Sequence, residues 1–360
     1  MEIKSLIEKF SHVVSVTGYE YMAETAIKKI IDEDFQGVFD EVSFDKLGSC
    51  RLVKKGVRKI GGVKKIMLDA HIDQIGLVVT EILDGGFLRV KQLGGIDNNI
   101  LIASEFYVYT KSFDDENPFI FSAENRIPAI AVSVPPHLKK TKGDELPKIE
   151  DLYLDTGYDS KKDLEKIVKV GCPVSFKSDF LSLENNLVSS VGLDDRLCAL
   201  TLMLAVKSLK SLPDADVHIV LSVSEETGGP GAATAAFDIQ PDFAAVLDVG
   251  FAKVPEVDAG AFEICKGAGI SYSAATNMNL TKKVIAIAKE KKIPIQPIAE
   301  PRSTGTNADE IQITGEGIPC VLISVPVKNM HTFNEICSVQ DVESTAKLVA
   351  EIIENAGKLI

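Results

Sequence analysis

Five residues with metal-binding side chains stand at the ends of apolar segments of this sequence. They are two histidines and three carboxylates: His71, Asp194, Glu226, Asp248 and His331. Each lies at or just beyond the end of a predicted core strand, or at the start of a predicted helix. Open α/β sheets place their ligands at the carboxyl ends of strands. We therefore expect the five side chains to meet in one cleft.

The charge of this set indicates metal ions. Three carboxylates in one cleft repel each other unless cations neutralise them. Two divalent ions bring four positive charges against three negative ones, and a bridging hydroxide balances the sum. Imidazole and carboxylate ligands without thiolates suit Zn²⁺, Co²⁺ or Mn²⁺. We expect two divalent metal ions per chain, with zinc as the first choice.

A carboxylate follows His71 at a distance that lets it orient the ring. Residues two apart on a strand face the same side, so Asp73 can reach the imidazole of His71. A metal-bound histidine usually donates its other N–H to a carboxylate or carbonyl, which fixes the ring. Taken alone, the spacing also suits an ordinary surface or core pair. The interpretation depends on the other ligands.

Asp194 and Asp195 stand where a loop becomes a helix. Carboxylates are favoured at a helix N-terminus by capping and by the helix dipole. Capping alone would explain one of the two residues and even both. In the functional interpretation, Asp194 bridges two metal ions while Asp195 caps the helix or orients a neighbour.

Glu225 and Glu226 follow the apolar residues 217–223 and precede a glycine-rich turn. Most such pairs are solvated surface residues, but this one ends a strand that is expected to be central. Two adjacent carboxylates suit a division of labour in which one binds metal and the other moves a proton. Glycines at 228, 229 and 231 would let the backbone approach a substrate closely.

The remaining histidines and the cysteines receive structural interpretations. The histidines are His12, His137 and His218, and the last of them falls inside a predicted strand. The cysteines are scattered and form no CxxC: Cys50, Cys172, Cys198, Cys265, Cys320 and Cys337. Neither a disulfide framework nor a thiolate zinc site is indicated. We expect free thiols in a reducing compartment.

Length and composition limit the class of protein. A chain of 360 residues exceeds the size at which one core stops growing, so two domains are expected. The net charge of −13 argues against binding to nucleic acid, whose phosphates require clustered Lys and Arg. No apolar stretch is long enough to span a bilayer, and the N-terminus lacks the apolar core of a signal peptide. We expect a cytoplasmic protein without nucleic-acid or membrane partners.

The order of predicted elements indicates an α/β fold with an insertion. Strands are expected at 64–71, 217–223, 244–247 and 320–327, and helices at 194–209, 280–291 and 342–353. This alternation predicts a mostly parallel mixed sheet flanked by helices. Residues 75–178 differ, with short strands, turns and a hairpin signal around Asp84-Gly85-Gly86. We therefore expect a catalytic domain of residues 1–74 and 179–360, interrupted by a small β-rich domain of residues 75–178.

Short motifs along nearly the whole chain resemble the tetrahedral aminopeptidase family of co-catalytic metallopeptidases, some members of which are labelled endoglucanases. The motifs are Gly18-Tyr19-Glu20, Ala70-His71-Ile72-Asp73, Pro135-Pro136-His137, Leu193-Asp194-Asp195-Arg196, Glu225-Glu226-Thr227-Gly228, Leu247-Asp248-Val249, Gly305-Thr306-Asn307-Ala308 and Met330-His331. Their order and spacing are specific together, although no single motif is.

The resemblance implies a role for each candidate residue. The metal ligands would be Asp194 as the bridge, His71 and Asp248 at one ion, and Glu226 and His331 at the other. Glu225 would be the general base, and Asp73 the partner behind His71. The implied reaction is the removal of N-terminal residues from short peptides. The implied insertion is a PDZ-like β-barrel used in dimerisation, and dimers of the family often assemble into a hollow tetrahedral dodecamer. We therefore expect a homo-oligomer, from dimer to dodecamer.

The chain departs from the family pattern at two places. Family members usually carry Asp where this chain has Asn307, which keeps the shape of the side chain but loses a charge. Relatives also often carry a bulkier residue and an Arg in the segment 227–231. The substrate preference of relatives is therefore not carried over.

Two other functions compete with an aminopeptidase. A glycosidase would need two carboxyl groups about 5–9.5 Å apart on either side of the scissile bond, and it gives no role to His71 and His331. A catalytically impaired oligomeric scaffold of the same family finds support only in Asn307. The presence of every expected ligand argues against the scaffold.

Overall fold

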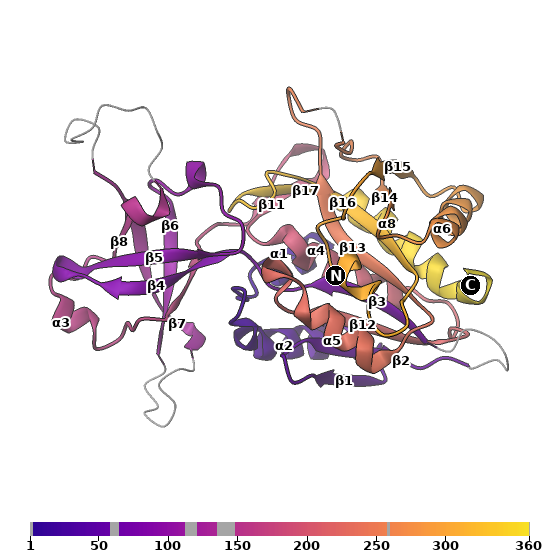
Figure 1. The fold of residues 1–360 in the computed structure, drawn as a ribbon, viewed down its shortest axis with the longest axis horizontal. Helices are drawn as coiled ribbons and strands as arrows, with labels where there is room; N and C mark the ends of the chain where they lie inside the picture. Colours follow the sequence, from indigo (N-terminus) through magenta and orange to yellow (C-terminus); the bar gives the residue numbers. More distant parts are fainter. Residues whose placement is uncertain (1–2, 58–64, 112–120, 135–147, 258–259, 360) are drawn as a thin grey trace.

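A computed structural model describes residues 3–57, 65–111, 121–134, 148–257 and 260–359. It has two parts, an α/β domain and a smaller β-barrel, which lie side by side along the long axis (Figure 1). The Pro135-Pro136-His137 motif and almost all of the predicted loop at 139–148 lie outside the described residues.

The helices belong mainly to the α/β domain. They are α1 (Ile3–Ser11), α2 (Glu24–Asp34), α3 (Lys161–Leu164), α4 (Leu193–Lys207), α5 (Pro230–Ile239), α6 (Met278–Glu290), α7 (Ala308–Ile311), α8 (Val339–Glu354) and α9 (Ala356–Leu359). Of these, α3 lies beside the barrel (Figure 1).

The large sheet has a parallel centre and antiparallel flanks. Its strands are β1 (Glu41–Phe44), β2 (Cys50–Lys54), β3 (Lys65–His71), β10 (Leu181–Ser182), β11 (Leu187–Ser190), β12 (Asp216–Ser222), β13 (Phe243–Phe251), β14 (Ala268–Ser273), β15 (Ile295–Glu300), β16 (Cys320–Lys328) and β17 (Glu335–Ser338). The order is β1-β2-β12-β3-β13-β16-β17-β11-β10, and β14 pairs with β15 and β16. The neighbours β12, β3, β13 and β16 are parallel, so their carboxyl ends meet at one edge.

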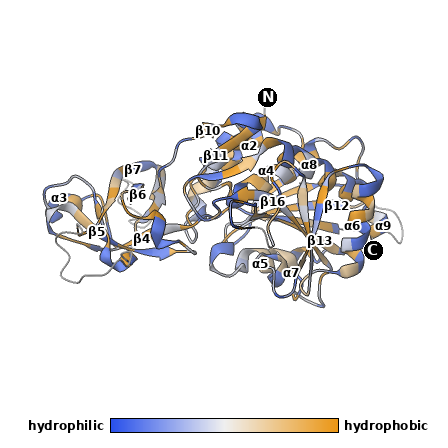
Figure 2. Ribbon diagram, turned by 90° about the horizontal axis from the view of Figure 1, so that it is seen from above, coloured by the Kyte–Doolittle hydropathy of each residue, from blue (hydrophilic) through white to orange (hydrophobic). Residues whose placement is uncertain are grey.

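Side-chain alternation gives each central strand two buried faces. In β3, Leu68 and Ala70 join the larger core with α4, whereas Met67 joins a second core with α5. Successive residues of a strand point to opposite faces, so a sheet covered on both sides needs nearly continuous apolar strands. Figure 2 shows the hydrophobic colour concentrated inside the α/β domain. This burial fixes the backbone on which the candidate ligands stand.

The barrel is closed and antiparallel. Its strands are β4 (Gly76–Ile82), β5 (Phe87–Leu93), β6 (Glu105–Lys111), β7 (Phe121–Val132), β8 (Tyr153–Asp155) and β9 (Pro173–Phe176), and they close in the order β4-β5-β8-β7-β6-β9. A separate hydrophobic core fills it, including Leu77, Leu88 and Phe106. The hairpin between β4 and β5 turns at Asp84–Gly86, where Gly85 has a φ of 74°.

The predicted fold class is confirmed: a mixed sheet flanked by helices, with a small β-barrel. Within the described ranges, the strands that pair in parallel are the four central ones and β14 with β15. The domain bounds 75 and 178 stay a prediction, although the barrel strands run from Gly76 to Phe176. Among the described residues, no helix has the length and hydrophobicity needed to cross a membrane.

Candidate metal centre

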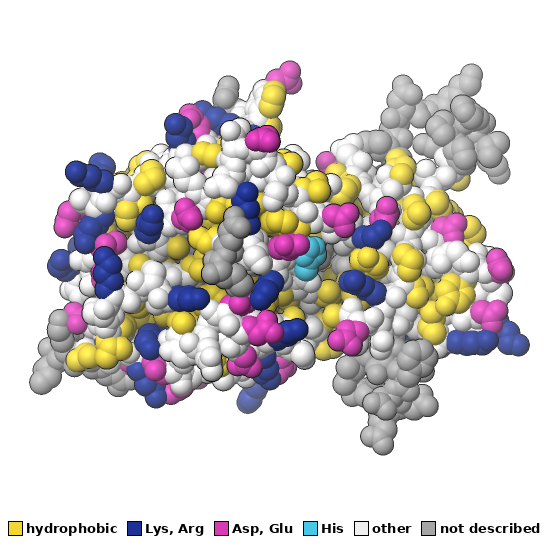
Figure 3. Space-filling view, turned by 180° about the vertical axis from the view of Figure 1, so that it is seen from behind, with side chains coloured by type: hydrophobic (Ala, Val, Ile, Leu, Met, Phe, Trp, Pro, Cys, Tyr) yellow, Lys and Arg dark blue, Asp and Glu magenta, His cyan; other side chains and the backbone are white. Residues whose placement is uncertain are grey.

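The five predicted ligands converge at the carboxyl edge of the central strands. Four of them, His71, Asp194, Asp248 and His331, line a cleft of about 520 Å³ together with Glu225. Glu226 lies behind them, with 4% of its side chain exposed. Figure 3 shows a histidine beside acidic side chains on the face where the two domains adjoin.

The ligand atoms form two sets that share Asp194. One set is His71, Asp194 and Asp248, and the other is Asp194, Glu226 and His331; within each set the ligand atoms lie within 4.8 Å of one another. Asp194 Oδ1 is 3.2 Å from His71 Nε2, and Asp194 Oδ2 is 3.4 Å from His331 Nε2. The two oxygens of one carboxylate therefore face two different sites.

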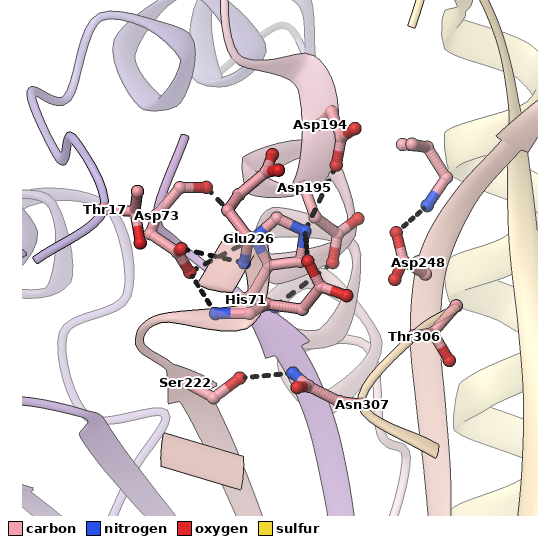
Figure 4. A network of polar contacts seen from close by, with 12 residues as sticks. Thr17, His71, Asp73, Asp194, Asp195, Ser222, Glu226, Asp248, Thr306 and Asn307 are labelled. Atoms are coloured by element: carbon pink, nitrogen blue, oxygen red, sulfur yellow. Dashed lines mark hydrogen bonds and ion pairs between the residues drawn. The ribbon is translucent and has the colours of Figure 1, made fainter. Parts of the chain in front are cut away.

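His71 is held through its ring and its backbone (Figure 4). Its Nδ1 lies 3.0 Å from the backbone carbonyl of Asp73 and 3.4 Å from the carboxylate Oδ1 of the same residue. Its backbone N–H donates to Asp195 Oδ2 at 3.2 Å. With Nδ1 as the donor, Nε2 is left as the free acceptor that faces Asp194.

The carboxylate of Asp73 mainly holds the turn that carries the two glutamates. It accepts hydrogen bonds from the backbone N–H groups of Glu225, at 3.0 Å, and Glu226, at 3.2 Å. Buried Glu20 holds the preceding residue, because its Oε1 accepts from the backbone N–H of Ser224 at 2.8 Å and from its hydroxyl at 3.0 Å. Ser224 has a φ of 61°, so this turn depends on these contacts.

The two glutamates then point to different places. Glu225 faces the cleft, with Oε2 3.8 Å from His71 Nε2. Glu226 points toward the second set, with Oε2 3.6 Å from His331 Nε2. Their positions suit a proton carrier and a ligand, respectively.

Glu335 is hydrogen-bonded to residues of both ligand sets, and it was not identified from the sequence. It is 2% exposed. Its Oε2 accepts from the backbone N–H of Asp194 and its Oε1 from the backbone N–H of His331, both at 3.0 Å. One carboxylate therefore fixes the backbone of a ligand from each of two distant segments. Nothing in its local sequence marks it except its place four residues after His331.

Burial and mutual interaction shift the pKa values of several groups in this cluster. The hydrogen bond to Asp194 raises the pKa of His331 to about 10. Burial raises the pKa of Glu226 to about 8, and the charge on Asp194 adds to the rise. Burial also raises the pKa of Asp248 well above its usual range. Protons on these groups take the place of positive charge that the pocket otherwise lacks.

One buried cation lies beside the cluster. Arg196 is 1% exposed and donates to Ser15 Oγ and to the carbonyl of Ser11, both at 2.8 Å. Burial lowers the pKa of Arg196 to about 10, so it stays charged at neutral pH. It lies near Glu335, Asp194 and Asp73, and the same cluster also contains Asp195, Glu225, Glu226 and Asp248. Further positive charge is needed to balance them.

Asn307, the departure from the family pattern, is paired with a carboxylate. Its Nδ2 donates to Ser222 Oγ at 2.9 Å (Figure 4) and to Asp69 Oδ1 at 2.8 Å. Asp69 is fully buried in β3, two residues before His71. A carboxyl group therefore lies across the hydrogen bond from Asn307, on Asp69, and burial raises its pKa to about 7. The neighbouring Thr306 lines the cleft.

Comparison with known proteins places this mixed sheet, with its histidines and carboxylates clustered at the carboxyl ends of parallel strands, among the peptidases. The M42 glutamyl aminopeptidase family matches residues 48–348. The lysyl aminopeptidase of Pyrococcus furiosus is 32% identical over 354 residues, covering 97% of this chain and 96% of the relative.

Solved structures agree with this match. A TET aminopeptidase from the marine sediment archaeon Thaumarchaeota archaeon SCGC AB-539-E09 has a TM-score of 0.87 and 28% identity, covering 97% of this chain and 95% of that one. The TET1 peptidase of Pyrococcus horikoshii has a TM-score of 0.82 and 27% identity, and the match covers 98% of this chain and 99% of that one. That peptidase is described as able to assemble into a tetrahedron or a large octahedral shell. The chain belongs to the M42 family of aminopeptidases.

Proposed function

We propose that this aminopeptidase removes N-terminal residues from short peptides with a pair of metal ions. His71 and Asp248 bind one ion, Glu226 and His331 bind the other, and Asp194 binds both. The observation that carries the proposal is the position of Asp194, whose two oxygens each face the Nε2 of a different histidine. Neither binding of a single ion nor capping of α4 would require the Asp194 carboxylate to lie against both imidazoles.

The donor atoms of each set lie close enough together that they would hold one small divalent ion, since they are within 4.8 Å of one another. Imidazole and carboxylate donors without thiolate suit Zn²⁺, with Co²⁺ and Mn²⁺ as alternatives. The excess of buried carboxylates over Arg196 supplies the attraction for the ions.

The chain's own groups provide the proton transfers. When bound, the ions polarise the scissile carbonyl and lower the pKa of water. Glu225 faces the cleft, and burial raises its pKa, so its carboxylate can accept a proton from the attacking water. The same carboxyl then donates the proton to the leaving amine. Asp73, through the backbone N–H of Glu225, keeps that carboxylate in place.

Assembly into a homo-oligomer is part of the proposal. The TET1 peptidase of P. horikoshii supports it, because its solved structures include a dodecamer. A β-barrel that has its own core and extends from the α/β domain offers a surface for a second copy (Figure 1). Light scattering at micromolar concentration measures this directly. A monomer there would remove the interface role of the barrel and leave the enzymatic proposal standing.

The rival functions fit this site less well. A glycosidase gives no role to His71 and His331, although both imidazoles lie against the shared carboxylate. A scaffold without activity gains little from Asn307, because a carboxyl group, that of Asp69, still lies at that place and accepts its hydrogen bond.

Metal analysis combined with a substrate panel tests the proposal. We expect two ions per chain, hydrolysis of aminoacyl-anilides and no hydrolysis of cellulose derivatives. The chelated protein should lose the anilide activity and recover it with Zn²⁺, Co²⁺ or Mn²⁺. A metal-free protein with full activity on aminoacyl substrates would end the two-metal proposal.

A further inference from the structure

The loop that carries His331 rests on the barrel. The loop connects the end of β16 at Lys328 to β17 at Glu335. Phe333 stacks on Phe176 of β9, with ring centroids 5.5 Å apart and planes inclined by 27°. The next residue, Asn334, accepts a hydrogen bond from Ser178, just after β9, at 3.1 Å. The barrel therefore fixes the tip of a loop whose base belongs to the large sheet.

The barrel also contacts the His331 ring. The Nδ1 of His331 lies 2.9 Å from the backbone carbonyl of Gly95, in the segment that follows β5. A carbonyl only accepts, so Nδ1 carries the hydrogen and Nε2 is the atom left for a metal ion. His331 has a φ of 61° and its side chain is 39% exposed, so packing alone does not fix this ring.

Gly94, next to Gly95, packs against Glu226, which belongs to the same ligand set as His331. A Cβ added to Gly94 would lie 3.1 Å from Glu226 Oε2, 3.3 Å from Glu226 Cβ and 2.9 Å from Ile75 Cγ2. Gly94 also has a φ of 79°, which only glycine adopts readily. A side chain at position 94 would therefore strain the backbone and push against Ile75 and Glu226.

The first ligand set is held differently. His71 ends β3, where Asp73 and Asp195 orient it, and Asp248 lies inside β13. Both strands belong to the centre of the large sheet. The large sheet therefore positions His71 and Asp248. In contrast, Glu226 and His331 contact the barrel.

We infer that the barrel segment Gly94–Gly95, together with the Phe176–Phe333 contact, is a positioning element for the second metal site. This rests on the proposed two-metal function and assigns the barrel a role within its own chain. Any shift of the barrel relative to the sheet changes the affinity of the Glu226–His331 site and leaves the His71–Asp248 site intact. The two ions then differ in affinity for a structural reason.

Metal titration of matched glycine variants tests the inference. Gly94→Ala places a Cβ against Glu226 and Ile75. Gly85→Ala is the control, because Gly85 has a similar φ of 74° in the same barrel and its nearest contact is the Phe87 ring at 3.3 Å. Isothermal titration of apoprotein with Zn²⁺ and metal analysis give the affinity and number of ions. We expect Gly94→Ala to keep one tight ion and to bind the second about tenfold to hundredfold more weakly. Gly85→Ala should match the unmodified chain.

Phe333 provides a second pair of variants in case Gly94→Ala does not fold. Phe333→Ala removes the ring contact and should weaken the second ion selectively, whereas Phe333→Leu should restore much of the affinity. The inference is overturned if the folded variants bind both ions with unmodified affinity, or if both ions weaken equally. If the unmodified chain itself binds fewer than two ions, the proposed two-metal function has failed instead.

Discussion

The backbone N–H of Asp194 donates a 3.0 Å hydrogen bond to the buried carboxylate of Glu335, a residue 141 positions later in the chain. The other oxygen of that carboxylate accepts from the backbone N–H of His331. Asp194, the proposed bridge, and His331, a proposed ligand of the second ion, are thus fixed by one side chain. Removal of that side chain should affect stability and metal binding together.

Glu335→Gln leaves one oxygen to accept and places an NH₂ group against the remaining backbone N–H. An unsatisfied buried donor costs about 1–3 kcal/mol, so the free energy of unfolding should fall by that amount. Urea denaturation of the apoprotein measures it, with the exposed Glu343→Gln on α8 as the control. Equal stability of the two variants would remove Glu335 from the support of the site.

The two adjacent glutamates should differ in what they lose. Glu225→Gln should keep both ions and lower kcat by about 10²–10⁴-fold, because the proton carrier is removed. Glu226→Gln should lose an ion, because its carboxylate lies 3.6 Å from His331 Nε2 in the second set. Metal analysis and steady-state kinetics on the same preparations compare them. Equal loss of metal in both variants would show that the two roles are wrongly assigned.

Asn307 can be tested by exchanging it with its partner. Asn307→Asp puts two buried carboxylates in contact, and an uncompensated buried charge costs about 3–5 kcal/mol. The double variant Asp69→Asn, Asn307→Asp restores one donor and one charge, so it should recover most of the stability. Thermal unfolding of the two single variants and the double variant gives the coupling. A double variant no more stable than Asn307→Asp would mean that the pair is not exchangeable.

The sequence predicted that the side chains of the five candidate ligands would meet, because each stands at the end of an element that its local pattern reveals; their role as metal ligands stays a prediction. His71 follows an apolar strand that is recognisable by itself, and Asp194 stands at a helix start. The β-rich insertion was predicted for the same reason, since Asp84-Gly85-Gly86 is a local turn signal, whereas its barrel form was implied by the family resemblance. Glu335 and Gly95 could not be predicted, because their roles come from contacts across 141 and 236 residues. A buried acid and a glycine carbonyl have no local signature of orienting a distant backbone or ring.

The pH dependence of the metal-free protein follows from two raised pKa values. Glu226 shifts from 4.5 to about 8 and His331 from 6.5 to about 10, so the folded state binds more protons than the unfolded state between these values. Stability contributed by these groups is present below the unfolded pKa and is lost as the pH rises through the folded pKa. The pKa of Asp194 is held below its ordinary value, so its contribution is complete above about pH 5. Chelated protein should melt at progressively lower temperature from pH 6 to pH 9.

Metal binding should depend on pH in the opposite sense. Ions must displace the protons on Glu226 and His331, so their affinity rises with pH. A ligand that binds only the folded state stabilises it by about 2.7 kcal/mol at a hundredfold excess over Kd. The difference in melting temperature between loaded and chelated protein should therefore widen from pH 6 to pH 9. Differential scanning fluorimetry with and without chelator at each pH measures this difference. A constant or narrowing difference would contradict the assignment of these two residues as ligands, because protons and ions would then not compete for the same atoms.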